Sequence, residues 1–136
     1  MTRIGGKKVS LFKNLNGLMG NASKISQSEI EHEVTPLLTN EEYVEQAYKL
    51  IRDLFIFTNK RLILIDKQGM TGKRVEYLSI PYKNISYFSV QSAGHLDLNS
   101  ELFLFLSGNT QPIIKTFNSK QDIHDIQILL AHYVLQ

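Results

Sequence analysis

The chain has 136 residues, of which 43% are hydrophobic, with a formal net charge of +2 and no cysteine. This length predicts a single structural domain, and the hydrophobic content excludes a disordered chain. The absence of cysteine excludes disulfides and thiolate zinc sites. It fits a reducing cytoplasm, which is the location we expect, with a membrane-peripheral position as the alternative. No apolar run is long enough for a membrane span or a signal peptide, and the net charge does not indicate nucleic acid.

Charged residues are segregated along the chain. Residues 1–24 carry cations and no acid, residues 29–45 carry six glutamates and no Lys or Arg, and residues 49–83 are mainly cationic. Such blocks are typical of interaction surfaces, or of faces that are simply solvated, and the sequence leaves both interpretations open.

The amino-terminal segment, residues 1–40, is predicted to be helical. Ser10 begins a first pattern, whose apolar positions are Leu11, Leu15, Leu18 and Met19. Gly20 and Asn21 are suited to end this helix. We interpret the segment as an extension that packs on the rest of the domain or on a neighbouring subunit. The alternative is contact with an anionic membrane through its apolar and basic residues.

A second helix is predicted to begin at Ser26 or Ser28 and to continue toward Leu38. Pro36 lies inside this pattern, and proline cannot donate the hydrogen bond that a helix interior needs. We therefore expect a kink or an end near Thr35.

From Tyr43 the pattern changes to short β-prone runs separated by turn residues. Seven strands are predicted: Tyr43 to Ile51, Leu54 to Phe57, Leu62 to Ile65, Val75 to Ile80, Ile85 to Gln91, Glu101 to Leu106 and Pro112 to Phe117. The residues Ser107 to Thr110 are a hairpin turn signal, and Pro81 marks an edge or a break.

The carboxy-terminal residues switch to a helical period. Ser119 and Asp122 resemble a capping box, and an apolar stripe follows at Ile123, Ile126, Leu130, Tyr133 and Val134. Seven short strands and one amphipathic helix predict a mainly β fold, a sandwich or barrel with the helix covering an open end.

Two long runs carry a resemblance to a known family. They are "YKLIRDLFIFTNKRLILIDKQGMTGKRVEYLSIPY" and "ISYFSVQSAGHLDLNSELFLFLSG", and "GNAS" and "LLAHYVL" resemble the ends of the same family. The chain resembles the bacterial pleckstrin-homology-like domain. The resemblance implies a seven-stranded antiparallel barrel capped by a carboxy-terminal helix, with the amino-terminal helical segment as an addition. It also implies assembly into rings, for which a pentamer is the reported form.

Phosphoinositide-binding members of the wider pleckstrin-homology group carry a basic motif between their first two strands. The matching connection here holds Lys49 and Arg52, with Asp53 beside the second cation, and so departs from that pattern. Lys60 and Arg61 form a further cationic turn, interpreted as the tip of a hairpin that joins the second and third strands. These four cations are the candidate contacts for an anionic lipid. The alternative is that they are solvated turn residues.

No catalytic constellation is visible, and we expect neither an enzyme nor a cofactor. Glu29, His32 and Glu33 have a spacing that can hold a divalent metal, but an exposed helix face is the favoured interpretation, so no metal site is predicted. The aromatic residues near Lys83 are interpreted as core and cross-strand pairs rather than as a nucleic-acid surface.

Two functional hypotheses follow. The first is a non-catalytic module that forms a homo-oligomeric ring and also binds a partner protein of unknown identity. Its candidate contact residues lie on two predicted edge strands: Tyr77, Ile80, Ile85, Tyr87 and Phe88. The second is peripheral binding to an anionic phospholipid surface through the basic turns.

Overall fold

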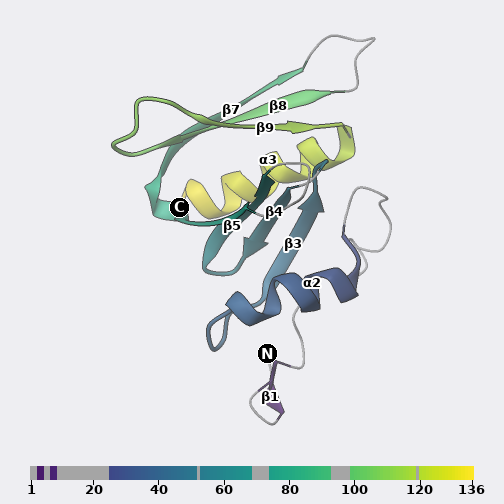
Figure 1. Cartoon of the computed structure of the whole chain (residues 1–136). Helices are drawn as coiled ribbons and strands as arrows, with labels where there is room; N and C mark the ends of the chain where they lie inside the picture. Colours follow the sequence, from purple (N-terminus) through teal and green to yellow (C-terminus); the bar gives the residue numbers. More distant parts are fainter. Residues whose placement is uncertain are drawn as a thin grey trace. The chain divides into compact units, whose positions relative to one another are not determined.

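The computed structural model describes residues 3–4, 7–8, 25–51, 53–68, 74–92, 99–118 and 120–136. The first predicted helix, from Ser10, lies outside the described residues, as do Arg52 and Ser119. The chain divides into two compact units, Met1–Ser79 and Ile80–Gln136 (Figure 1).

The first unit opens with short elements. Strands β1 (Arg3–Ile4) and β2 (Lys7–Lys8) pair in an antiparallel ladder that the sequence did not predict. Helix α2 (Gln27–Glu33) is capped by Ser26, whose hydroxyl accepts the backbone N–H of Glu29 at 3.2 Å. The helix ends before the 3₁₀ turn η1 (Thr35–Leu37). The predicted end near Thr35 is therefore confirmed, because Pro36 cannot continue the α-helical hydrogen bonds.

A four-stranded sheet forms the body of the first unit. Its order is β3 (Val44–Lys49), β4 (Leu54–Thr58), β5 (Arg61–Gln68), β6 (Arg74–Pro81), and β4 pairs antiparallel with both neighbours. β6 ends at the predicted break, Pro81. Each of the four strands overlaps one of the predicted strands.

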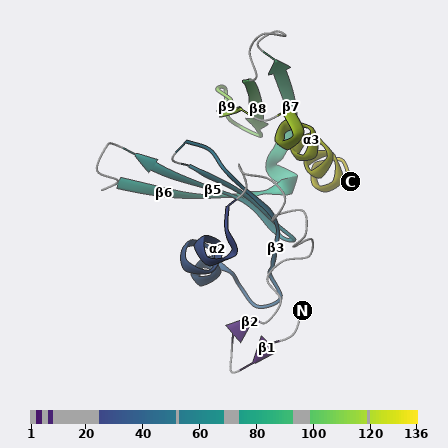
Figure 2. The ribbon, with the colours of Figure 1, turned by 90° about the vertical axis from the view of Figure 1, so that its right-hand side faces the viewer.

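One face of this sheet packs against α2 (Figure 2). Ala47, Ile56 and Ile63 lie opposite one another on adjacent strands and share a buried cluster with Ile30 and Val34. Two ion pairs also join α2 to the sheet: Glu29 with Lys49 at 3.2 Å, and Glu33 with Lys67. Part of the predicted amino-terminal extension thus packs on strands of its own unit.

The other face of the sheet is also buried. It carries Tyr48, Phe55 and Phe57, whose rings meet edge-on or tilted with centroids 6.4 and 5.4 Å apart. Strand β4 is buried at every residue, which explains why its sequence, LFIFT, is an almost unbroken apolar run.

The second unit holds η2 (Tyr82–Asn84), the antiparallel sheet β7 (Ile85–Ser92), β8 (Ser100–Leu106), β9 (Ile113–Phe117), and helix α3 (Lys120–Val134). α3 contacts all three strands and η2 (Figure 1). Its predicted stripe is confirmed, because Ile123, Ile126 and Leu130 are buried, and Tyr133 stacks on Tyr82 at 4.3 Å.

The prediction of seven antiparallel strands followed by a helix is confirmed, and the strands form sheets of four and three. The β8–β9 turn lies at the predicted place, with Gly108 in the left-handed region at φ +86°. The separation of residues 1–40 as an extension of one domain stays a prediction.

Candidate interaction surfaces

The cationic turn between β4 and β5 is a hairpin connection, as predicted, with Phe57 opposite Leu62 at its base. The hydroxyl of Thr58 accepts the backbone N–H groups of Lys60 and Arg61 at 3.0 and 2.9 Å. The same hydroxyl donates to the carboxylate of Glu42 at 2.7 Å. A single buried threonine therefore both shapes the turn and ties it to a distant residue.

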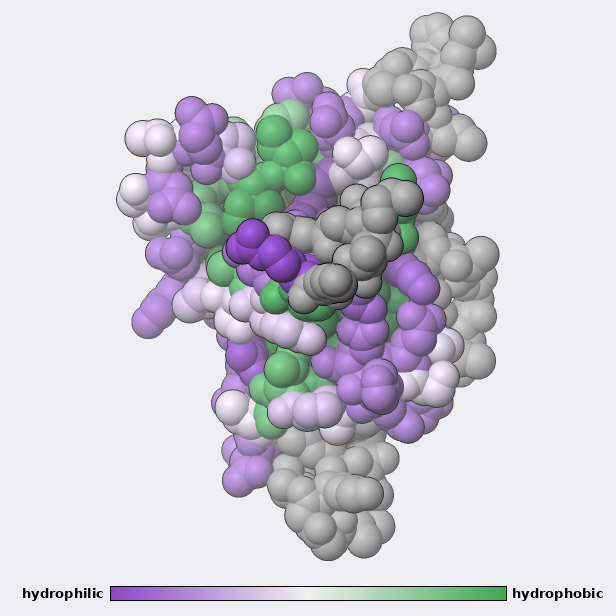
Figure 3. All heavy atoms as spheres, viewed as in Figure 1, coloured by the Kyte–Doolittle hydropathy of each residue, from purple (hydrophilic) through white to green (hydrophobic). Residues whose placement is uncertain are grey.

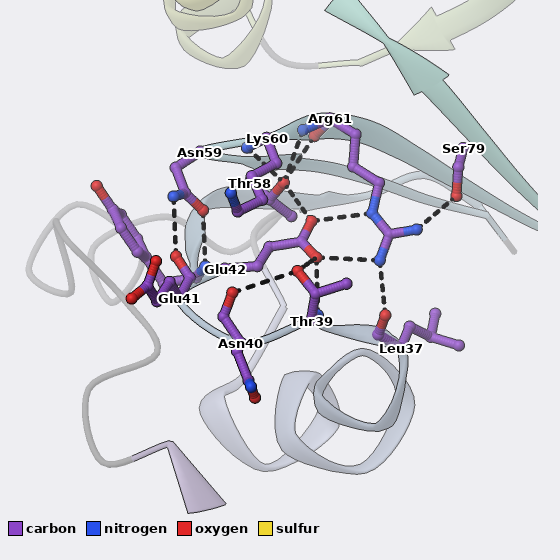
Figure 4. Close-up of polar contacts among 11 residues, drawn as sticks. Leu37, Thr39, Asn40, Glu41, Glu42, Thr58, Asn59, Lys60, Arg61 and Ser79 are labelled. Atoms are coloured by element: carbon purple, nitrogen blue, oxygen red, sulfur yellow. Dashed lines mark hydrogen bonds and ion pairs between the residues drawn. The ribbon is translucent and has the colours of Figure 1, made fainter. Parts of the chain in front are cut away.

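Arg61 is held by three neighbouring segments (Figure 4). Its guanidinium binds Glu42 through two bonds, Nε to Oε2 at 2.9 Å and Nη2 to Oε1 at 3.1 Å. It also donates to the carbonyl of Leu37 at 2.6 Å and to the hydroxyl of Ser79 at 2.9 Å. The interpretation of both turn cations as solvated is wrong for Arg61, because the buried Glu42 carboxylate requires a compensating charge. Lys60 is exposed, as interpreted.

The carboxylate of Glu42 is fully buried and saturated by protein donors. Besides Arg61 and Thr58, it accepts the backbone N–H of Thr39 at 3.0 Å and the Thr39 hydroxyl at 3.2 Å. Burial alone would raise the pKa of Glu42. The hydrogen bonds from Arg61, Thr39 and Thr58 and the charge of Arg61 outweigh burial and lower that pKa from 4.5 to about 2. The site is suited to holding segments together, since it leaves no carboxylate oxygen for a ligand.

Asn59 fixes the backbone that leads into β3. Its side-chain amide donates to the carbonyl of Glu41 at 3.0 Å, and its side-chain oxygen accepts the N–H of Tyr43 at 2.8 Å. Glu41 has a φ of 65°, in the left-handed region that a non-glycine residue adopts at a cost. These two hydrogen bonds of Asn59 stabilise this conformation and position Glu42 close to Arg61.

The candidate lipid-contact cations do not come together. Lys49 lies at one end of β4, where it pairs with Glu29, whereas Lys60 and Arg61 lie at the other end. Arg61 is engaged with Glu42, and Arg52 is outside the described residues. Among the described members of these four candidate cations, Lys60 is the one that is exposed to solvent and forms no ion pair.

The five candidate assembly residues fall into two groups. Tyr77 and Tyr87 are 53% and 58% exposed, so their side chains are available to a partner. Ile80 and Ile85 are only 1% and 4% exposed, so their side chains belong to the core of the chain itself. Phe88 is partly buried, because the strand register directs it to the same face as buried Leu104.

One face of the β7–β8–β9 sheet carries further apolar residues that the sequence reasoning missed. Tyr87 stacks on Phe105 with ring centroids 4.3 Å apart, and the register places Phe103 and Ile114 on the same face. Ile114 is 48% exposed. Figure 3 shows apolar surface over the part of the molecule where Figure 1 draws these strands.

Val75, exposed on β6 beside Tyr77, was also missed as a contact residue. In a strand whose sequence alternates apolar and polar residues, the residues that face solvent can be identified from the sequence. The β8 run LFLFL and the paired isoleucines of β9 do not alternate in hydrophobicity, so their faces were hidden in the sequence.

Neither a metal centre nor a membrane-spanning helix occurs among the described residues. They contain no group of three or more His, Cys, Asp or Glu side chains placed to hold a metal, and Glu29 and Glu33 are each paired with a lysine. In that same part of the chain, no helix combines the length and the hydropathy that crossing a bilayer requires.

Comparison with known proteins gives consistent results. The model of the family described as "Bacterial PH domain" matches residues 13–134. The chain is 52% identical to the uncharacterised protein YjqA of Bacillus subtilis over 118 residues, which are 86% of this chain and 94% of YjqA. It is 32% identical to the uncharacterised B. subtilis protein YozO over 110 residues, 81% of this chain and 94% of YozO.

Solved structures show the same similarity. A pleckstrin homology domain from Shewanella amazonensis SB2B superposes with a TM-score of 0.73 at 47% identity, covering 91% of this chain and all of that one. A protein with a pleckstrin-homology domain from Shewanella loihica PV-4 gives a TM-score of 0.72 at 46% identity, covering 85% of this chain and 98% of that one.

Proposed function

The chain belongs to the bacterial PH domain family, and from this membership we propose that it is a non-catalytic interaction module that assembles into a homo-oligomeric ring. The observation that carries the proposal is the group of large apolar side chains exposed on strands of both sheets: Val75, Tyr77, Tyr87 and Ile114. The expected subunit count of five comes from the family resemblance.

Exposed apolar side chains on strands favour association. Each square ångström of apolar surface removed from water contributes roughly 25 cal/mol, and aromatic residues supply the most area. Tyr87 and Phe105 are already stacked, so they present a preorganised surface whose side chains lose little entropy on binding. A heterologous contact repeated by rotation closes into a ring.

The non-catalytic part of the proposal is supported by the Glu42 site. Its buried carboxylate, shifted in pKa to about 2, is the kind of group that can mark an active site. Here its oxygens accept hydrogen bonds from Thr39 just after η1, from Thr58 on β4 and from Arg61 on β5, and the side chain is buried. The perturbed carboxyl is accounted for by a structural role.

The test is the mass of the protein in solution, measured by light scattering after size exclusion. We expect a stable mass near five subunits for the unchanged chain. Tyr87→Asp should shift the mass toward one subunit, because it places a charge in the apolar contact. Ile128→Asp is the matched control, since Ile128 is 57% exposed on α3 and should leave the mass unchanged. A monomeric unchanged chain would contradict the proposal.

The alternative function is peripheral binding to anionic phospholipid through the basic turns. Lys60 is its best-placed residue, being exposed at a hairpin tip, and Lys49 is partly exposed beside Glu29. This alternative predicts sedimentation with phosphatidylserine vesicles at low salt, weakened by Lys60→Glu and by added salt. A chain that stays in the supernatant at low salt eliminates it.

A further inference from the structure

Strand β7 lies at the edge of its sheet and, among the described residues, has few of the features that protect such edges. It has eight residues, ISYFSVQS, with neither a charged residue nor a proline. Its register shift falls between Ile85 and Tyr87, at the start of the strand. Soluble proteins shield long edge strands with lysines, prolines, bulges or covering segments, because open backbone N–H and C=O groups recruit other strands. The open backbone groups of such an edge can therefore form hydrogen bonds with a strand of another chain.

Among the other edge strands of the two larger sheets, β3 and β9 differ from β7 in burial, length or charge, whereas β6 resembles it in length. Strand β3 is buried along all but its last residue, and β9 is five residues long and contains Lys115. Strand β6, at the edge of the four-stranded sheet, has eight residues like β7. It exposes four successive side chains, Arg74 to Tyr77, so both of its faces are open over that stretch.

We propose that the contact between copies is a strand pairing, in which β6 of one chain pairs antiparallel with β7 of the next. This inference rests on the proposed ring and specifies its contact. The two sheets then continue into each other across the contact as one intermolecular sheet of four plus three strands. Because β6 and β7 are different surfaces, the pairing is heterologous and can close a ring, whereas β7 with β7 would give only a dimer.

The equal lengths of the strands indicate the register. Full antiparallel overlap places Tyr77, which is 53% exposed, opposite Ser89, which lies on the same face of its sheet as the exposed Tyr87. It places Leu78 opposite Phe88, both partly buried and on the opposite face. No like charges meet, because β7 is uncharged. Pro81, which has no N–H to donate, falls at the end of the overlap.

The test uses cysteine cross-linking, for which the cysteine-free chain gives no background. Opposed residues of an antiparallel pair have Cα atoms about 4.5–5.5 Å apart, within the range of a disulfide. Size-tagged Tyr77→Cys chains are mixed with untagged Ser89→Cys chains and oxidised. We expect a mixed-size cross-linked pair, and no dimer from either variant alone. The chain with both substitutions should form a ladder that ends at the subunit count of the ring.

Ile128→Cys on α3 is the control and should remain uncross-linked when mixed with either variant. Dimers of Tyr77→Cys alone, or of Ser89→Cys alone, would indicate an isologous contact and overturn the pairing. An oligomeric mass by light scattering without the mixed cross-link would also overturn it, while leaving the proposed function intact. A monomeric unchanged chain would remove both.

Discussion

At the scale of single residues, the buried carboxylate of Glu42 organises the first unit. It accepts hydrogen bonds from Thr39 just after η1, from Thr58 on β4 and from Arg61 on β5, and Arg61 extends the network to Ser79 on β6. Breaking such a pair is costly, because the partner that remains keeps a charge without compensation. The turn cation that looked like a recognition residue is therefore a structural one.

The network predicts acid-sensitive stability. The pKa of Glu42 is about 2 in the folded chain against an ordinary 4.5, so its contribution is fully present above pH 4.5 and is lost as the pH falls toward 2. The difference corresponds to about 3 kcal/mol of unfolding free energy. Chemical denaturation across this pH range should show the loss in the unchanged chain, and a much smaller one in Glu42→Gln.

Glu42→Gln should also be destabilised at neutral pH, since Arg61 loses its charged partner. Glu76→Gln, at an exposed position on β6, is the matched control and should follow the pH profile of the unchanged chain. If Glu42→Gln kept the full acid dependence, the assignment of that dependence to Glu42 would be wrong.

These residue contacts could not be predicted from the sequence. Glu42 and Arg61 are nineteen positions apart, and Glu42 is one of six glutamates in an acidic block that offered no reason to single it out. Its burial depends on the left-handed turn at Glu41 and on the hydrogen bonds of Asn59, which are tertiary effects. The hairpin itself was predictable, because its polar residues separate two apolar runs.

At the scale of secondary-structure elements, α2 is held to the sheet mainly by apolar packing. Ile30 is fully buried among residues of β3, β4 and β5. Ile30→Ala should lower the unfolding free energy by about 2–5 kcal/mol through lost burial and a residual cavity. Thermal and denaturant unfolding measure this change. Ile128→Ala, at an exposed helix position, should change stability by less than about 0.5 kcal/mol.

The elements were largely predictable because local signals marked both their interiors and their ends. Pro36 ended α2, and glycine and polar turns separated the strands. The orientation of strand faces was less predictable. Ile80 and Ile85 were expected at a contact and are buried; they flank η2, close to the end of β6 and at the start of β7.

At the scale of the whole molecule, the proposed contact is apolar and uses backbone hydrogen bonds, so it should tolerate salt. We expect the mass by light scattering to be the same at about 0.1 M and about 1 M salt, although the Debye length falls from about 10 Å to about 3 Å. Dissociation at high salt would indicate instead that the acidic and basic blocks of neighbouring chains form the contact.

The fold of the whole molecule was predicted from strand spacing and from the family resemblance together. Seven strands and a terminal helix were expected and found. The number of subunits could not be predicted from strand or helix periodicity, because it depends on the angle between neighbouring copies. Fold alone does not specify function either.

The connections of Arg61 bear on how the chain folds during synthesis. Leu37 and Glu42 leave the ribosome before Arg61, and Ser79 emerges later still. Before β5 has been synthesised, Glu42 lacks its charged partner Arg61. Burial of the unpaired carboxylate would be costly, so the carboxylate stays hydrated. The complete network of Glu42 can therefore form only once β5 has been synthesised, and a chain held before Arg61 would lack one of the strands on which α2 packs.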